Sequence, residues 1–283
     1  MTPYDISPSR MRLKKLVRRA AVCVGRAIHP LRGAPTPGIR VLTYHRLGGS
    51  SLDPCNHLPE IFESNLQWLA ANAVVLSPQQ FVACLRAEAR APENAVLLSI
   101  DDGHASVAQH ALPLLTQYGF SALLFICPGL VRAGGDMMDW DELRAASARG
   151  HLIASHAFSH ASLGHMSLQQ ACNEIDTARA ALAEQLPVQE AAGLASQFFA
   201  YPFGTRADWN EALGDLLVSR GYRYCFTSAH GVCRPGDDAR FLPRIKIEGG
   251  SEGDLFPHIV RGCIDHWRLV DDSLHFLQQR GRL

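Results

Sequence analysis

The sequence has no long hydrophobic run, no excess of one charge and no regular cysteine spacing. No stretch reaches the ~20 continuous apolar residues that a membrane-spanning helix needs. Lys and Arg number 27, and so do Asp and Glu, so no overall field favours nucleic acid or an acidic partner. The eight cysteines are scattered, without the C-x-x-C spacing of a metal site. These absences argue against a membrane-embedded protein, a nucleic-acid-binding protein and a paired-cysteine metal site.

No linker rich in Pro, Ser or Gly and no internal repeat divides the 283 residues, of which 47% are hydrophobic. A chain of this length and composition can bury a large core. We therefore interpret residues 39–283 as one catalytic domain and residues 1–38 as a basic N-terminal extension. Cys84, Cys127 and Cys225 lie in apolar patterns and are expected to be reduced core residues, which favours a reducing compartment.

The extension combines six basic residues within positions 10–19 with the short apolar run 20–25. Arg26 ends that run before the ~7–15 apolar residues of a signal peptide, so secretion is the third choice. A solvated, partly frayed extension is one alternative, and with it we expect a cytoplasmic protein. The other is a basic amphipathic helix lying on anionic lipid at the inner membrane face. In that helix the residues turned inward would be Met11, Leu13, Leu16, Val17, Ala20 and Val24.

After the extension, strand patterns alternate with helical patterns, which predicts a parallel α/β barrel. Ser77 and Ser167 are expected to cap two of the helices at their N-termini. Strands are predicted at 39–45, 74–76, 95–100, 121–127, 151–155, 196–201, 222–227 and 241–247. Helices are predicted at 60–71, 78–89, 106–118, 140–149, 168–186 and 208–220.

Two short motifs carry groups that suit catalysis. Asp101 and Asp102 end one apolar run, and His156 and His160 follow another, four residues apart. One Asp and two His form a common ligand set for a catalytic divalent metal, and a second carboxylate can take a proton from water.

Each motif also has a simpler interpretation. Asp-Asp-Gly is typical of a turn, and a His pair can arise by chance among 13 histidines. Both motifs nevertheless follow predicted strands, where barrel enzymes place catalytic groups. Their conjunction therefore indicates a metallohydrolase.

Three segments carry a resemblance to a known family. They are Ser-Ile-Asp-Asp-Gly (99–103), Gly-His-Leu-Ile-Ala-Ser-His-Ala-Phe-Ser-His (150–160) and Phe-Ala-Tyr-Pro-Phe-Gly (199–204). These resemble the first three motifs of the polysaccharide deacetylase family, carbohydrate esterase family four. Tyr44-His45-Arg46 resembles the opening strand of many members, and the similarity runs in order over residues 40–247. The resemblance implies a distorted, incomplete (β/α) barrel of about seven parallel strands.

The resemblance also implies roles for the motif residues. We assign Asp102, His156 and His160 as metal ligands and Asp101 as the general base, which is the family's order. Two nitrogens and one oxygen suit Zn²⁺, with Co²⁺, Ni²⁺ or Fe²⁺ as alternatives. In the family, the backbone N–H after the third-motif proline helps to hold the tetrahedral oxyanion. Carried over, that donor belongs to Phe203.

The sequence departs from the family pattern in two places. The third motif usually begins with an Arg that orients the catalytic carboxylate, and Ala200 stands there instead. Arg244 could supply this guanidinium from another strand through a bidentate pair; the alternative is a surface charge on an edge strand. The late histidine motif, which usually provides the general acid, has no clear match. The candidates are His45, His230 and His258, of which His45 is best placed because it ends the first strand.

We predict a metal-dependent hydrolase that removes N-acetyl groups from the amino sugars of a glycan or of a lipid-linked or nucleotide-linked precursor. Trp140 and Trp209 could stack on sugar rings or simply pack. One alternative is hydrolysis of another C–N bond, such as deformylation of a lipid-linked sugar. The other is a non-catalytic glycan-binding protein, against which Asp101 argues because binding needs no base beside a metal.

Overall fold

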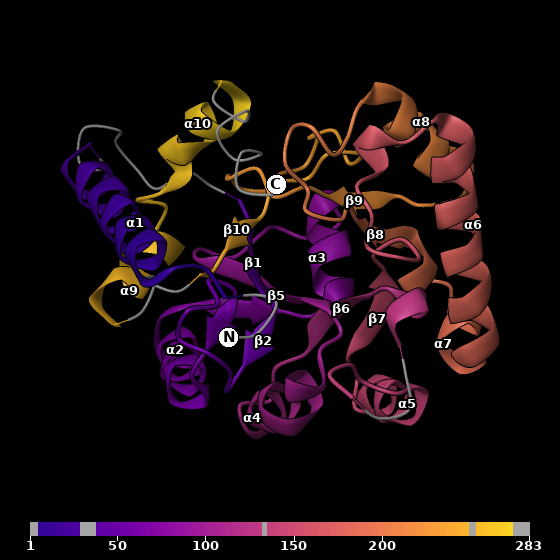
Figure 1. Ribbon diagram of the computed structural model, residues 1–283, viewed down its shortest axis with the longest axis horizontal. Coiled ribbons are helices and arrows are strands. Elements are labelled where there is room, and N and C mark those ends of the chain that lie inside the picture. Colours follow the sequence, from indigo (N-terminus) through magenta and orange to yellow (C-terminus); the bar gives the residue numbers. More distant parts are fainter. Residues whose placement is uncertain (1–4, 29–37, 132–134, 249–252, 274–283) are drawn as a thin grey trace.

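The computed structural model describes residues 5–28, 38–131, 135–248 and 253–273. Its centre is an open, curled half-barrel of parallel strands in the order β10-β1-β5-β6-β7-β8-β9, with β4 paired to the start of β5 (Figure 1). The predicted incomplete barrel of about seven parallel strands is therefore confirmed. The strands are β1 Arg40–Tyr44, β4 Val74–Leu76, β5 Ala95–Asp102, β6 Ala122–Ile126, β7 Leu152–Ser155, β8 Phe198–Ala200, β9 Tyr224–Phe226 and β10 Ile245–Lys246.

Helices surround this sheet, and the predicted caps are present at two of them. The Ser77 side chain accepts from the backbone N–H of Gln80, and Ser167 does the same for Gln170. The predicted helix 106–118 begins with a π-helical turn, Val107–Ala111. Two short strands, β2 Arg46–Leu47 and β3 Asn56–His57, form a separate pair. The helices after β3 are α2 Pro59–Asn72, α3 Pro78–Leu85, α4 Leu112–Gln117, α5 Trp140–Ala148, α6 Leu168–Gln185, α7 Pro187–Ala191, α8 Glu211–Ser219, α9 Phe256–Val260 and α10 Arg268–Ser273.

Alternate residues of β5 serve two different hydrophobic cores. Leu98 and Ile100 pack in the cluster beneath the outer helices, whereas Leu97 packs in the barrel interior with Phe81 of α3. Successive side chains of a strand point to opposite faces, so Asp101 continues the inner series. The fold thereby places this carboxylate at the end of the barrel where the strands finish, which is where α/β barrels carry their sites.

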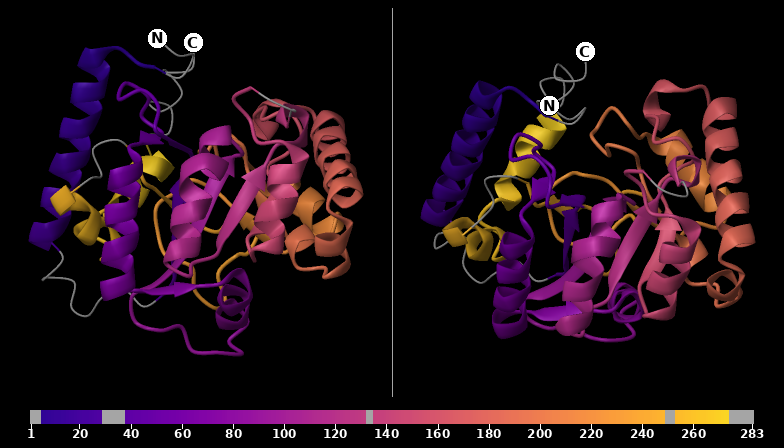
Figure 2. Two further views of the ribbon diagram at one scale, coloured as in Figure 1. Left: turned by 90° about the horizontal axis from the view of Figure 1, so that it is seen from below. Right: turned by 60° about the horizontal axis from the view of Figure 1, so that its bottom comes forward.

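The N-terminal helix α1, Pro8–Ile28, lies beside α9 although the two are far apart in the sequence (Figures 1 and 2). Val22 is fully buried in the outer core, and an Arg18 Nη2 donates to the backbone carbonyl of Lys246 across 2.6 Å. A solvated or frayed extension does not fit this packing. The predicted boundary between residues 38 and 39 adjoins residues 29–37, which lie outside the described part of the chain, and stays a prediction.

The face of α1 that contacts the protein is not the one made by the six apolar residues that would face lipid in the amphipathic-helix alternative. Of the six apolar residues named above, only Met11 is buried. The other five are exposed, and the helix instead turns Arg18, Ala21, Val22 and Gly25 toward the protein. Small residues there allow close approach, since a Cβ on Gly25 would overlap the carbonyl oxygen of Cys263. None of the described helices has the length and apolarity to cross a bilayer.

Candidate metal centre

An open pocket of about 300 Å³ lies where β1 and β5 end and where the chain leaves β7 and β8. It is the natural place for a site in a parallel barrel. The fold brings all the predicted site residues to its wall, namely His45, Asp101, Asp102, His156, His160, Phe203 and Arg244. Their positions agree with a common site, and their individual roles stay predictions.

Unusual backbone conformations let neighbouring residues face this pocket together. Asp102 ends β5 with a φ of 74°, so its side chain escapes the strict alternation that would turn it away from Asp101. His160 has a φ of 63° and Phe203 a φ of 61°. A non-glycine residue in this region costs about 1–3 kcal/mol, and such strain collects at functional sites. Three strained residues in one pocket therefore support a functional centre here.

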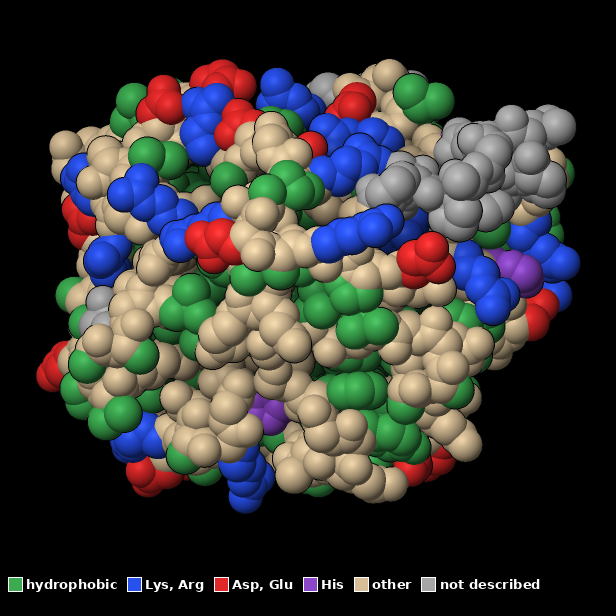
Figure 3. Space-filling view, turned by 180° about the vertical axis from the view of Figure 1, so that it is seen from behind, with side chains coloured by type: hydrophobic (Ala, Val, Ile, Leu, Met, Phe, Trp, Pro, Cys, Tyr) green, Lys and Arg blue, Asp and Glu red, His purple; other side chains and the backbone are tan. Residues whose placement is uncertain are grey.

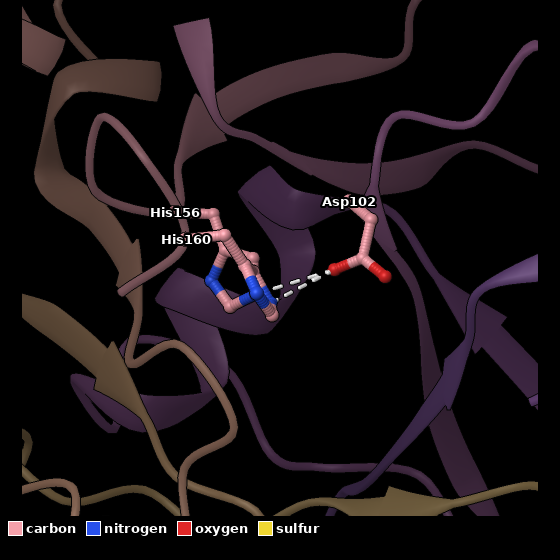
Figure 4. A group of neighbouring side chains, drawn as sticks. All are labelled: Asp102, His156 and His160. Atoms are coloured by element: carbon pink, nitrogen blue, oxygen red, sulfur yellow. Dashed lines mark ion pairs between the residues drawn. The ribbon is translucent and has the colours of Figure 1, made fainter. Parts of the chain in front are cut away.

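The three predicted ligands converge on one point (Figure 4). The Oδ1 atom of Asp102 lies 3.2 Å from Nε2 of His160 and 3.7 Å from Nε2 of His156. One ligand atom from each residue lies within 4.8 Å of the others. This arrangement has the donor types and the compactness of a divalent-metal site with an open position.

The hydrogen bonds around the cluster show that it suits a cation. Nδ1 of His156 lies 2.7 Å from the carbonyl oxygen of Ala200, which can only accept, so Nδ1 carries the proton and Nε2 presents its lone pair. Burial lowers the pKa of His156 to about 4, so the ring is neutral. Asp102 Oδ1 is buried and has no hydrogen-bond partner. A lone pair that faces an unpartnered carboxylate oxygen is repelled unless a cation joins the two, so these residues fit a bound metal.

Asp101 lies next to the cluster and is held as a carboxylate. Its side chain is almost completely buried, and Oδ1 accepts a hydrogen bond from Nη1 of Arg244 across 2.8 Å. Oδ2 lies 3.9 Å from Nε2 of His156. Burial raises the pKa of Asp101, but the Arg244 guanidinium, together with His156 and His45, outweighs burial and holds that pKa below its usual range. An ionised carboxylate with one oxygen on the metal side is a suitable general base.

Arg244 reaches Asp101 from the seam of the half-barrel. Leu242 forms a bridge with Phe226 of β9, and Ile245, the residue directly after Arg244, pairs with Leu42 of β1. Only 3% of Arg244 is exposed, so the alternative of an edge-strand surface charge is wrong.

The expected bidentate pair is wrong as well. While Nη1 of Arg244 holds Asp101, its Nε donates to the backbone carbonyl of Thr227 across 3.0 Å. The guanidinium is thereby divided between a carboxylate and a backbone group. The two bonds fix the plane of the Arg244 guanidinium, and one of them goes to Asp101.

Of the three candidate general acids, only His45 lies at the pocket. Burial, with a contribution from Lys246, lowers the pKa of His45 to about 3, and its Nδ1 is buried without a hydrogen-bond partner. His230 instead holds Oδ2 of Asp271 with its backbone N–H and with Nδ1, at 2.7 and 2.9 Å. His258 lies on α9, and neither it nor His230 lines the pocket.

The two tryptophans also lie away from the pocket. Trp140 packs against the outer core, and Trp209 stacks on Phe241 with ring centroids 4.6 Å apart. Neither lines the pocket, so packing rather than sugar stacking describes both.

The sequence interpretation missed Arg46, which holds the second oxygen of the metal-site carboxylate. Nε and Nη2 of Arg46 bind the two oxygens of Asp53 at 2.7 and 3.2 Å, and Nη1 lies 3.2 Å from Oδ2 of Asp102. Asp102 therefore turns Oδ2 to Arg46 and Oδ1 to the histidines. Arg46 stood in the Tyr-His-Arg segment, but its partner Asp53 lies in a loop that no periodicity marks.

Comparisons with known proteins agree with this architecture. The polysaccharide deacetylase family model matches residues 88–225. The Bacillus subtilis protein YxkH, provisionally named a polysaccharide deacetylase, is 24% identical over 219 residues, which cover 76% of this chain and 74% of that protein. A poly-β-1,6-N-acetyl-D-glucosamine N-deacetylase of Staphylococcus aureus is 24% identical over 211 residues, covering 71% of this chain and 69% of the relative.

Two solved structures share the fold. A deacetylase of Streptococcus pyogenes in complex with acetate has a TM-score of 0.69 at 20% identity, covering 79% of this chain and 98% of that one. IcaB from Ammonifex degensii has a TM-score of 0.68 at 24% identity, covering 81% and 98%. The half-barrel of this chain thus has the fold of these two solved structures. The polysaccharide deacetylase family model matches the part of the chain that contains Asp101, Asp102, His156 and His160.

Proposed function

We propose that the protein is a metal-dependent N-deacetylase that acts on the N-acetylated amino sugars of a glycan. One observation carries the proposal: a buried, ionised Asp101 lies beside the convergent oxygen and nitrogen atoms of Asp102, His156 and His160. The family match supports a deacetylase. The name of the S. aureus relative supports β-1,6-linked N-acetylglucosamine as the first substrate to test.

Asp102, His156 and His160 would hold the cation, and we propose Zn²⁺ because two imidazole nitrogens and one carboxylate oxygen suit it. A divalent cation in such a site acidifies water and polarises a carbonyl oxygen. The protein's own contribution is to keep the ligands fixed and in the right protonation state. His156 does this through its bond to the Ala200 carbonyl, and Asp102 through Arg46.

Asp101 would act as the base toward the attacking water. Arg244 occupies Oδ1, so Oδ2 is the oxygen available to accept the proton. The amide N–H of Phe203 would donate to the oxygen on which charge develops, and a donor of this kind contributes about 2.7–4 kcal/mol. The water oxygen adds to the acetyl carbon, and the carbonyl π electrons move to the oxygen that Phe203 would contact. The C–N bond then breaks as the nitrogen takes up a proton, which gives acetate and a free amine.

The leaving nitrogen needs a proton. With a pKa of about 3, His45 is uncharged at neutral pH. A neutral imidazole carries a single N–H and is not an effective general acid. Asp101, once it has accepted the proton of water, is the group in the pocket that can return it. We therefore propose that the proton passes from Asp101 to the nitrogen, directly or through His45.

The test is acetate release from β-1,6-linked and β-1,4-linked N-acetylglucosamine oligomers, with Zn²⁺ or Co²⁺ added and with Asp101→Asn as control. We expect acetate from the wild-type protein and a loss of about 10²–10⁴-fold in the variant. Formate released from N-formyl sugars in place of acetate would favour the deformylase alternative. Oligomer binding without any hydrolysis would favour the glycan-binding alternative.

A further inference from the structure

The helix α1 presents a stripe of apolar side chains on the side that faces away from the protein. Leu13 is 60% exposed, Leu16 65%, Val17 42% and Val24 50%. Positions 13, 16, 17, 20 and 24 recur at the spacing that places residues on one face of a helix. Single exposed apolar residues are ordinary, but an aligned group on one helix marks an interaction surface.

The same helix is strongly basic. Its 21 residues include seven Lys or Arg and no Asp or Glu. Lys14 and Arg18 point inward, where Lys14 pairs with Glu248 across 2.9 Å and Arg18 binds the Lys246 carbonyl. Viewed from behind, several basic side chains, with acidic ones among them, lie at the edge of the molecule formed by α1 and α9 (Figure 3). The helical spacing places a row of exposed residues along one border of the apolar stripe: Arg12, Lys15, Arg19 and Arg26.

We propose that this outer face of α1 docks the protein on an anionic lipid bilayer. The helix would lie parallel to the surface, with Leu13, Leu16, Val17 and Val24 in the boundary between headgroups and acyl chains. The basic row would lie at the level of the lipid phosphates. A second copy of the chain is a poorer occupant, because two helices without any acidic residue repel each other.

The inner face of α1 connects this surface to the pocket. Lys246, whose carbonyl binds Arg18, lines the pocket, and Glu248 links Lys246 to Lys14. The thickness of one helix, about 10–12 Å, therefore separates the proposed lipid surface from the segment that forms the pocket wall. This docking does not depend on the proposed reaction, since it rests on the outer face of α1 alone.

The experiment is sedimentation of the full chain with vesicles of phosphatidylcholine alone or with about 30% phosphatidylglycerol, at low salt. We expect the wild-type protein to bind the anionic vesicles only. Leu13→Gln/Leu16→Gln should lower the partition coefficient about tenfold or more. Arg12→Gln/Lys15→Gln should lower it about fivefold for each charge removed.

The matched control is Leu168→Gln/Val188→Gln, which alters two apolar residues of α6 and α7 that are 53% and 86% exposed. This control should bind vesicles like the wild-type protein, and thermal unfolding should be the same for all four proteins. Equal vesicle binding by the α1 double-leucine variant and the control would overturn the proposal. So would equal binding to vesicles without phosphatidylglycerol, or loss of a dimer in the α1 variant without loss of vesicle binding.

Discussion

The Nη1 atom of Arg244 lies 2.8 Å from Oδ1 of Asp101, and the two side chains, 143 residues apart in sequence, are 3% and 2% exposed. Such a pair lowers the pKa of the acid and also fixes the direction of its free oxygen. Arg244 lies in the segment that bridges β9 and pairs with β1. A guanidinium therefore contacts Asp101 although position 200 is Ala. The guanidinium reaches Asp101 from the residue that directly precedes β10.

Replacing Arg244 with Ala should reduce turnover by about 10²-fold or more, because it leaves a buried carboxylate without its partner. Without the guanidinium, less opposes the effect of burial on Asp101, so its pKa rises. A base works only when ionised, so activity is lost as pH falls through that pKa, and the acidic limb of the rate profile should move to higher pH. The measurements are kcat against pH and metal content, which should not change.

Arg244→Lys is the informative companion. One ammonium cannot bond Asp101 and the Thr227 carbonyl in the plane that the guanidinium defines, so little turnover should return. Recovery of most of the wild-type rate in Arg244→Lys would mean that charge alone matters. An unchanged acidic limb in Arg244→Ala would show that Arg244 does not control the base.

His156→Ala and His160→Ala should each lose the bound metal, since each removes one of three protein ligands. The measurement is metal content after dialysis, with expected occupancy near one ion per chain in the wild-type protein. His258→Ala is the control, because His258 lies on α9 and does not line the pocket. Full occupancy in either ligand variant would contradict the assignment.

The two adjacent carboxylates should give opposite phenotypes. Asp101→Asn should keep the metal and lower turnover by about 10²–10⁴-fold, which is the usual contribution of a positioned base. Asp102→Asn should weaken metal binding, because Oδ1 of Asp102 is the oxygen that faces both imidazoles. Metal titration and acetate release on the same samples separate the two effects. A reversed pattern would exchange the roles of Asp101 and Asp102.

Local patterns in the sequence predicted a parallel α/β barrel with its site where the strands end, and the family resemblance added that the barrel is incomplete. The apolar run of β5 and the alternation along it determine where Asp101 lies, and the motif that follows β7 determines where the two histidines lie. No such pattern marks the contacts that depend on the loops over the site. The Arg46–Asp53 pair and the division of the Arg244 guanidinium depend on how loops fold over the site.

The sequence of α1 likewise does not determine which face of the helix contacts the protein. Its sequence has two faces rich in small or apolar residues, and periodicity alone does not tell which of them contacts the protein. The close approach of Gly25 to Cys263 and the hydrogen bond from Arg18 to the Lys246 carbonyl decide this, and both depend on segments late in the chain. The polar residue Arg18 therefore lies inside, whereas Leu16 lies outside.

Arg46 should be a positioning residue for Asp102. Since Arg46→Ala alone would leave Asp53 buried without its partner, the test variant is Arg46→Met/Asp53→Asn. Loss of such a support commonly costs 10–100-fold in metal affinity, so we expect the metal Kd to rise by about that factor. Asp53→Asn alone, which keeps Arg46 beside Asp102, is the control and should bind metal more tightly than the double variant. Equal affinity in the two would remove Arg46 from the site.

The two valines of α1 at positions 22 and 24 should respond differently to the same substitution. Val22 is fully buried in the outer core and Val24 is 50% exposed, although both lie in the same helical turn. Val22→Ala removes buried methyl groups, which costs about 2 kcal/mol. In a chain of this size that corresponds to a fall of about 4–8 °C in Tm.

Val24→Ala removes the same atoms from the outer face and should change the free energy of unfolding by less than about 0.5 kcal/mol. Its effect should appear instead as weaker binding to anionic vesicles, because Val24 belongs to the apolar stripe proposed to dock on lipid. Thermal unfolding and vesicle sedimentation of the two variants therefore separate the two faces of one helix. If Val22→Ala left Tm unchanged, α1 would not be packed on the core in solution. If Val24→Ala lowered Tm as much as Val22→Ala, the outer face of α1 would be packed against protein in solution. That face would then not be available to lipid, and the proposal would be contradicted.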